Sequence, residues 1–124
     1  MKILVVDDEQ DVKLLFQQRF RKEIRNKELH FAFAFSGEEA LTDLGELNHE
    51  AVLILSDINM PGMSGLELLE QIKKNFLKPP PVVMMITAYG DKENYDTAMR
   101  LGADDFLTKP LEFGILKEKL KALL

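Results

Sequence analysis

Four short apolar runs of the sequence each end in polar side chains whose types could do chemistry together. The polar residues are Asp7 and Asp8 after residues 3–6, Asp57 after residues 51–56, Thr87 after residues 82–86, and Lys109 after residues 106–108. Three carboxylates in one place repel one another unless a cation lies between them. Oxygen ligands without histidine or cysteine favour Mg²⁺ or Mn²⁺ over zinc. The carboxylates therefore predict a divalent cation site.

The remaining two polar groups indicate what the cation would accompany. The Lys109 ammonium can pair with a carboxylate before a reaction and with a phosphoryl oxygen after it, and the Thr87 hydroxyl can donate to another phosphoryl oxygen. Phosphoryl transfer needs in-line positioning and neutralisation of charge on the equatorial oxygens. A carboxylate can itself be the nucleophile and form an acyl phosphate. The residue types therefore indicate phosphoryl transfer.

These residues can meet only if the apolar runs are neighbouring parallel strands. The runs alternate with segments of helical period, which predicts a parallel sheet covered by helices on both faces. Five βα units predict a flavodoxin-like (βα)5 fold, a doubly wound three-layer α/β sandwich with strand order 2-1-3-4-5, which binds ligands outside the carboxyl ends of the strands. We expect strands at Lys2–Val6, Leu29–Phe35, Ala51–Ser56, Val82–Ile86 and Asp105–Thr108, and helices at Val12–Arg25, Ser36–Leu47, Ser64–Phe76, Lys92–Leu101 and Glu112–Leu124.

Local signals support several of these boundaries. Ser36 with Glu39, and Ser64 with Glu67, match the capping box that begins a helix. Asp91 is a candidate cap for the next helix. Among the helical segments, Val12, Leu15, Phe16, Phe20 and Ile24 are predicted to share one apolar face, and Lys117, Lys119 and Lys121 are predicted to form a solvated face.

The composition narrows the class of protein. The chain has 124 residues, and without a repeat or linker it is expected to form one domain over residues 1–124. A net charge of −5 argues against a general nucleic-acid surface. Cysteine is absent, so there is neither a disulfide nor a thiolate metal site. No apolar stretch reaches the roughly 18–20 residues of a membrane span, and a signal-peptide pattern is missing. We expect a cytoplasmic protein without direct contact with nucleic acid or membrane.

Four motifs together resemble those of response-regulator receiver domains of two-component phosphorelay signalling. They are Val5-Val6-Asp7-Asp8-Glu9, Ser56-Asp57-Ile58-Asn59-Met60-Pro61-Gly62, Ile86-Thr87-Ala88 and Thr108-Lys109-Pro110. Each motif alone is moderately specific, whereas all four in this order are strongly specific. The resemblance covers essentially the whole chain.

The resemblance implies that Asp57 accepts a phosphoryl group from a histidine of a partner histidine kinase or phosphotransfer domain. It implies that Asp8 and Asp57 ligate Mg²⁺ directly, that Asp7 acts mostly through water, and that the backbone carbonyl of Asn59 is the third protein ligand. Such a domain catalyses only its own phosphorylation and dephosphorylation, so we do not expect an enzyme that acts on other substrates.

The same resemblance implies a conformational switch. Thr87 and Lys109 would hold the phosphoryl oxygens, the Lys109–Pro110 bond would be cis, and Phe106 would change rotamer together with Thr87. The change would repack the surface of the fourth helix, fifth strand and fifth helix, which in the family docks an output domain, a partner protein or a second copy in a homodimer.

Three other functions fit parts of the pattern. A magnesium-dependent phosphohydrolase with an aspartate nucleophile would carry a second aspartate where Asn59 stands, and an amide cannot shuttle a proton. A flavodoxin-like cofactor protein would need a glycine-, serine- or threonine-rich phosphate loop where Asp7, Asp8 and Glu9 stand. A purely structural receiver would commonly have lost the acidic pocket. The intact set of residues favours the phosphorylated switch.

Overall fold

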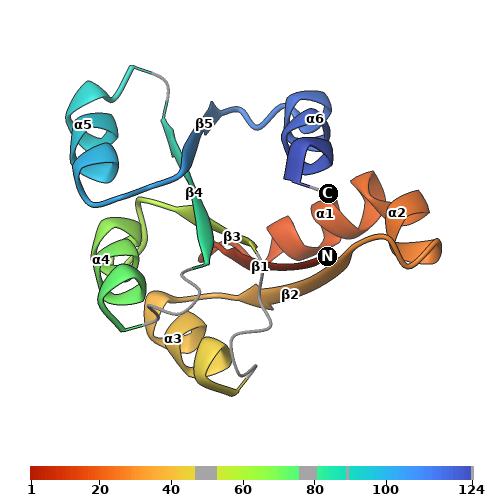
Figure 1. Ribbon diagram of the computed structural model, residues 1–124, viewed down its shortest axis with the longest axis horizontal. Coiled ribbons are helices and arrows are strands. Elements are labelled where there is room, and N and C mark those ends of the chain that lie inside the picture. The colour runs from red at the N-terminus through yellow and green to blue at the C-terminus, as the bar shows by residue number, and fades with distance from the viewer. Residues whose placement is uncertain (47–52, 76–80, 89, 124) are drawn as a thin grey trace.

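The computed structural model describes residues 1–46, 53–75, 81–88 and 90–123. Five strands form one parallel sheet in the order β2-β1-β3-β4-β5. The strands are β1 (Lys2–Val6), β2 (His30–Ala34), β3 (Leu53–Asp57), β4 (Val82–Ala88) and β5 (Asp105–Lys109). The helices are α1 (Asp11–Arg19), α2 (Arg21–Arg25), α3 (Gly37–Glu46), α4 (Gly65–Asn75), α5 (Lys92–Arg100) and α6 (Phe113–Leu123). The predicted flavodoxin-like fold and strand order are confirmed (Figure 1).

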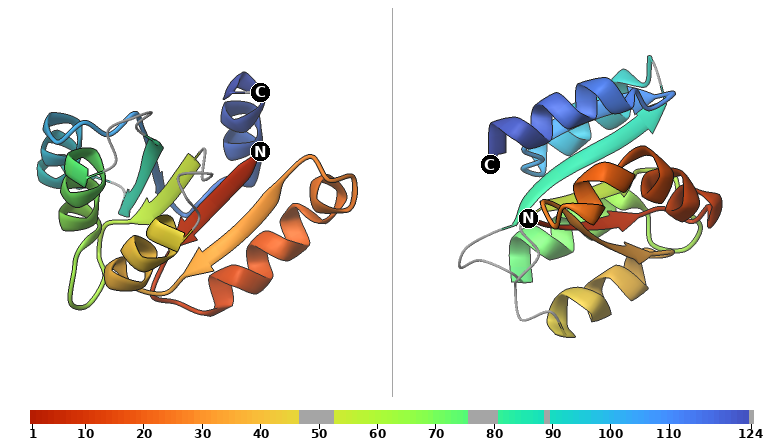
Figure 2. Two further views of the ribbon diagram at one scale, coloured as in Figure 1. Left: turned by 60° about the horizontal axis from the view of Figure 1, so that its bottom comes forward. Right: turned by 90° about the vertical axis from the view of Figure 1, so that its right-hand side faces the viewer.

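Two hydrophobic cores lie on the two faces of the sheet, because successive side chains of a strand point to opposite faces. On one face, Leu4 and Val6 of β1 pack with residues of α3, α4 and α5. On the other face, Ile3 and Val5 pack with Phe16 of α1 and with α6. The helices therefore lie on both sides of the sheet, as Figure 2 shows from two further directions.

The single helix predicted over Val12–Arg25 is wrong in one respect, because the helix is interrupted at Phe20. This residue leaves helical backbone angles (φ −111°, ψ 22°) and separates α1 from α2. Its side chain is fully buried, and its ring contacts Phe16, Phe31 and Phe113. Packing in this aromatic cluster outweighs the local helical period. Leu15 also departs from the predicted apolar face, since it is 40 % exposed.

The predicted helix starts are confirmed by their side-chain caps. Ser36 Oγ accepts the Glu39 N–H at 3.0 Å, Ser64 Oγ accepts the Glu67 N–H at 3.2 Å, and Asp91 Oδ1 accepts the Asn94 N–H at 3.2 Å. These bonds satisfy amides that have no partner inside the first helical turn. The boundaries predicted at Leu47, Ala51, Phe76 and Leu124 lie outside the described residues.

Strands β3, β4 and β5 reach further toward their carboxyl ends than predicted. Asp57 is the last residue of β3, β4 continues to Ala88, and β5 includes Lys109. Cross-strand pairing explains the extension, since Thr87 pairs with Thr108 and Ala88 with Lys109. The polar residues are therefore held by the sheet itself.

The lysines of α6 are more engaged than a solvated face implies. Lys119 Nζ lies 2.8 Å from Asp105 Oδ2 of β5, and Lys117 Nζ lies 3.3 Å from Glu23 Oε2 of α2. These ion pairs connect α6 to the elements beside it. In the part of the chain that the structure describes, no helix is long and apolar enough to cross a membrane.

Candidate functional site

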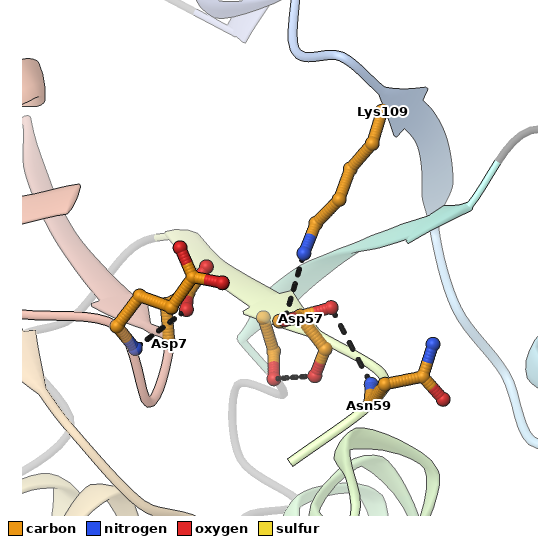
Figure 3. Close-up of polar contacts among 6 residues, drawn as sticks. Asp7, Asp57, Asn59 and Lys109 are labelled. Carbon is orange, nitrogen blue, oxygen red and sulfur yellow. Dashed lines mark hydrogen bonds and ion pairs between the residues drawn. The ribbon is translucent and has the colours of Figure 1, made fainter. Parts of the chain in front are cut away.

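The carboxyl edge of the sheet brings together three polar residues from three strands. Asp57 ends β3, which lies between β1 and β4, and Asp7 follows β1 directly. Lys109 ends β5, one strand beyond β4, and its side chain extends to Asp57 (Figure 3). The site thus lies where the sheet order reverses, beside the junction of β1 and β3.

Asp57 is a buried carboxylate, only 3 % exposed, with a donor near each oxygen. Lys109 Nζ donates to Oδ2 at 2.9 Å, and the Asn59 N–H approaches Oδ1 at 3.4 Å. The first is a short charge-assisted bond and the second a long one. Lys109 is itself 41 % exposed, so its ammonium can reach both the carboxylate and solvent. One oxygen of Asp57 therefore accepts a strong hydrogen bond, and the other accepts only a weak one.

The electrostatics of the site are dominated by the carboxylates. Burial alone would lower the pKa of Lys109, but the hydrogen bond and charge of Asp57, followed by the charges of Asp7 and Glu9, raise this pKa overall. Burial also raises the pKa of Asp7, and the nearby Asp57 adds to this effect, although the Glu9 N–H that Asp7 accepts opposes it. These interactions favour the protonated form of Lys109 and disfavour the negative charge on Asp7.

The acidic residues fit a divalent cation. Asp7, Asp8 and Asp57 can each offer one carboxylate oxygen, and these oxygens lie within 4.8 Å of one another. An all-oxygen set suits the hard cations Mg²⁺ and Mn²⁺. Asp8 is exposed, so the set is open to solvent on that side. Burial is the main reason that the pKa of Asp7 is raised, and a bound cation would offset the smaller contribution from repulsion by Asp57 and Asp8. The predicted carboxylates are thus together, and Asn59 lies at the start of the adjoining loop.

Thr87 presents a buried hydroxyl that lacks a partner. The side chain is 1 % exposed, and among the described residues its Oγ1 makes no hydrogen bond. A buried polar group without a partner costs free energy, so its presence calls for an explanation. Thr87 follows Ile86, the residue that pairs with Asp57 across β3 and β4. The hydroxyl therefore lies one residue from the level of Asp57 and is available to an incoming acceptor.

Phe106 belongs to β5, lies near Thr87 of β4 and is half-buried. Its ring meets that of Tyr95 edge-on, with centroids 4.7 Å apart, and a surface concavity is lined by Thr87, Tyr95 and Phe106. Tyr95 was missed by sequence reasoning, although an aromatic residue on the helix before β5 was the available signal. The Lys109–Pro110 peptide bond is cis.

Comparison with known proteins agrees with this architecture. The family model described as "Response regulator receiver domain" matches residues 3–121. The chemotaxis protein CheY homolog of Campylobacter jejuni is 32 % identical over 124 residues, a match covering 100 % of this chain and 92 % of that protein. A crystal structure of a response regulator receiver protein from Pseudomonas putida superposes with a TM-score of 0.84 at 26 % identity, covering 98 % of this chain and 95 % of the other.

A longer relative shows the same match over part of its length. The transcriptional regulatory protein ResD of Bacillus subtilis is 34 % identical over 125 residues, which cover 99 % of this chain but 48 % of ResD. The chain therefore spans about half of that relative.

The carboxyl edge of this doubly wound sheet carries a carboxylate, a lysine and a threonine, which are groups that can hold a phosphoryl group. With the matches above, the chain belongs to the response regulator receiver domain family. Receiver domains of this family are phosphorylation-dependent signalling switches of two-component systems, and they are not enzymes in the ordinary sense. The phosphohydrolase alternative is not favoured.

Proposed function

We propose that this receiver domain, formed by residues 1–124, takes a phosphoryl group onto Asp57 from a phosphohistidine of a histidine kinase or phosphotransfer domain. The observation that carries the proposal is the buried Asp57 carboxylate, held by Lys109 Nζ at 2.9 Å next to Asp7 and Asp8. We place this exchange in the cytoplasm, without direct contact of the domain with nucleic acid or membrane.

In the proposed transfer, one oxygen of Asp57 forms a bond to phosphorus while the P–N bond to the histidine ring breaks. The electron pair of that bond stays on the ring nitrogen. A phosphohistidine that is protonated on its other ring nitrogen is therefore released as neutral histidine. Lys109 then pairs with a phosphoryl oxygen, and Thr87 Oγ1 donates to another. Each residue is already within one or two positions of Asp57 in the sheet register.

The cation would be held by this chain's oxygens. Asp8 and Asp57 would ligate Mg²⁺ directly, Asp7 through water, and Asn59 through its backbone carbonyl, with Mn²⁺ as a substitute. When bound, the cation neutralises negative charge on the phosphoryl group during transfer. Apart from forming and hydrolysing its own aspartyl phosphate, the domain would carry out no reaction.

The signal would leave the site through Thr87. Movement of its hydroxyl toward the phosphoryl group makes room beside it, and the ring of Phe106 can turn into that space. Because Phe106 packs on Tyr95, this movement would repack the surface of α5, β5 and α6. These elements are the predicted fourth helix, fifth strand and fifth helix, since the first predicted helix is divided into α1 and α2. We propose that this surface docks an output domain, a partner protein or a second copy of the chain.

The test is labelling by acetyl phosphate with Mg²⁺, followed by intact-protein mass spectrometry. The wild-type chain should gain one phosphoryl group that hydroxylamine removes, and EDTA should prevent the gain. Asp57→Asn should gain none, whereas Asp96→Asn, an exposed aspartate of α5, should label like the wild type. Labelling of Asp57→Asn at the wild-type rate would contradict the assignment of the acceptor.

A further inference from the structure

The loop of residues 58–64, which joins β3 to α4 and carries Asn59, is held from outside the site by α3. Glu38 Oε1, in the first turn of α3, accepts the Met63 N–H at 3.1 Å. The two residues are 25 positions apart in the sequence. Glu38 is exposed, so this bond lies at the surface and adds to the packing of the Met63 side chain against one of the hydrophobic cores.

Two glycines, Gly37 in α3 and Gly62 in the loop, let the loop and the helix come this close. A Cβ on the buried Gly37 would lie 2.8 Å from Met63 Sδ and 3.0 Å from Met63 Cβ, so the methionine side chain rests directly on the Gly37 backbone. Gly62 has a positive φ of 73°, and a Cβ there would lie 3.5 Å from Glu38 Oε1. Two loop residues thus sit against the first turn of α3.

The ends of the loop are fixed independently. The Ile58 N–H donates to Ile86 O of β4 at 3.0 Å, and the Gly65 N–H donates to Ile58 O at 2.8 Å. A Cβ on Gly65 would collide with the backbone carbonyl of Asp57, so this junction admits only glycine without a shift. Between these anchors the loop contains Pro61, whose ring restricts the backbone. The Met63 contact is therefore one of the restraints on the short segment that carries Asn59.

We propose that Glu38 is a positioning residue for the cation site, acting through the Met63 amide to hold the loop so that the Asn59 carbonyl faces the carboxylates. The inference rests on the proposed function only in taking that carbonyl as a ligand. A simpler role is available, because an acidic residue near a helix start interacts favourably with the helix dipole. The two roles differ in what they require of the side chain: the dipole requires charge, whereas the loop requires an acceptor oxygen.

Three variants separate these roles. Glu38→Gln keeps an acceptor oxygen and loses the charge, Glu38→Ala loses both, and Glu39→Ala removes a charge from the same turn of α3. Glu39 is likewise exposed, and its own N–H bond to Ser36 is a backbone contact that the substitution keeps. Exposure of both side chains means that the variants are expected to fold.

The measurements are Mg²⁺ affinity by isothermal titration calorimetry on the full, unphosphorylated chain, and hydrogen exchange of the Met63 amide by NMR in EDTA. Glu38→Ala should weaken Mg²⁺ binding about fivefold and accelerate Met63 exchange by a similar factor, as expected for loss of one hydrogen bond. Glu38→Gln should stay within about twofold of the wild type in both, because its amide oxygen still accepts. Glu39→Ala should match the wild type.

Wild-type Mg²⁺ affinity in Glu38→Ala would overturn the proposal, and so would equal losses in Glu38→Gln and Glu38→Ala, which would assign the effect to charge. Either result would leave labelling of Asp57 intact, so the proposed function would stand. If the wild-type chain bound no Mg²⁺, this inference and the cation requirement of the proposed function would both fall.

Discussion

Replacing Asp8 by asparagine should stabilise the protein without metal and remove most of the stabilisation by metal. The Asp8 carboxylate lies within 4.8 Å of oxygens from Asp7 and Asp57. Two unit charges at this distance repel by about 0.9 kcal/mol in water and about 3.5 kcal/mol at an effective dielectric constant near 20. Asp8 is exposed, so the lower figure applies, and Lys109 offsets part of the charge on Asp57. We expect Asp8→Asn to raise the free energy of unfolding by about 1 kcal/mol in EDTA.

Magnesium should cancel this advantage. Binding to the native state adds RT ln(1 + [L]/Kd), which is about 1.4 kcal/mol when free Mg²⁺ is ten times Kd. If the lost carboxylate weakens binding tenfold, the variant gains about 0.4 kcal/mol at the same concentration. The wild type and Asp8→Asn should then unfold at nearly the same urea concentration. The assay is urea unfolding followed by circular dichroism, in EDTA and across a Mg²⁺ series.

Asp96→Asn provides the matched control, because it removes one exposed negative charge on α5 that does not belong to the acidic cluster. It should change stability by less than about 0.5 kcal/mol and respond to Mg²⁺ like the wild type. The reasoning is refuted if Asp8→Asn gains no stability in EDTA, or if Mg²⁺ stabilises it as much as the wild type.

Two further predictions concern positions near the site and on α3. Gly65→Ala should lower the free energy of unfolding by about 1–3 kcal/mol, since the new methyl group meets the Asp57 carbonyl, whereas Gly114→Ala in open space on α6 should not destabilise; equal urea midpoints would contradict this. The pKa of Asp43 is raised, first by burial and then by two neighbouring glutamates. An acid with a raised pKa in the folded state stabilises below its unfolded pKa and loses that contribution as pH rises through the folded value. Asp43→Asn should therefore gain on the wild type as pH increases above 3.8, in urea unfolding at a series of pH values, and a pH-independent difference would disprove it.

The main features of the site were predictable because a parallel sheet collects the carboxyl ends of its strands at one edge. Residue types at the ends of apolar runs were therefore enough to bring Asp7, Asp57 and Lys109 together. Their separation in sequence did not matter, since strand order and register decide which ends are neighbours. The helix caps at Ser36 and Ser64 were predictable for a different reason, namely that a cap is a contact over three residues.

Contacts that depend on tertiary packing were not predictable in this way. The break at Phe20 results from burial of its ring among three other phenylalanines that belong to separate elements. The Glu38–Met63 bond joins residues of two units whose distance is set by packing of α3 against the loop. The pairing of Lys119 with Asp105 likewise depends on how α6 lies beside β5. No local spacing in the sequence encodes these distances.

The Thr87 hydroxyl, which has no hydrogen-bond partner among the described residues, raises the free energy of the unphosphorylated conformation. A buried donor or acceptor without a partner costs about 1–3 kcal/mol. A ligand atom that satisfied the hydroxyl in only one of two conformations would shift their ratio by roughly 5- to 150-fold. The unpaired hydroxyl would thus already reduce the free-energy difference between the resting and the activated conformation in the unmodified chain. A hydrogen bond formed only in the activated conformation would then increase the population of that conformation.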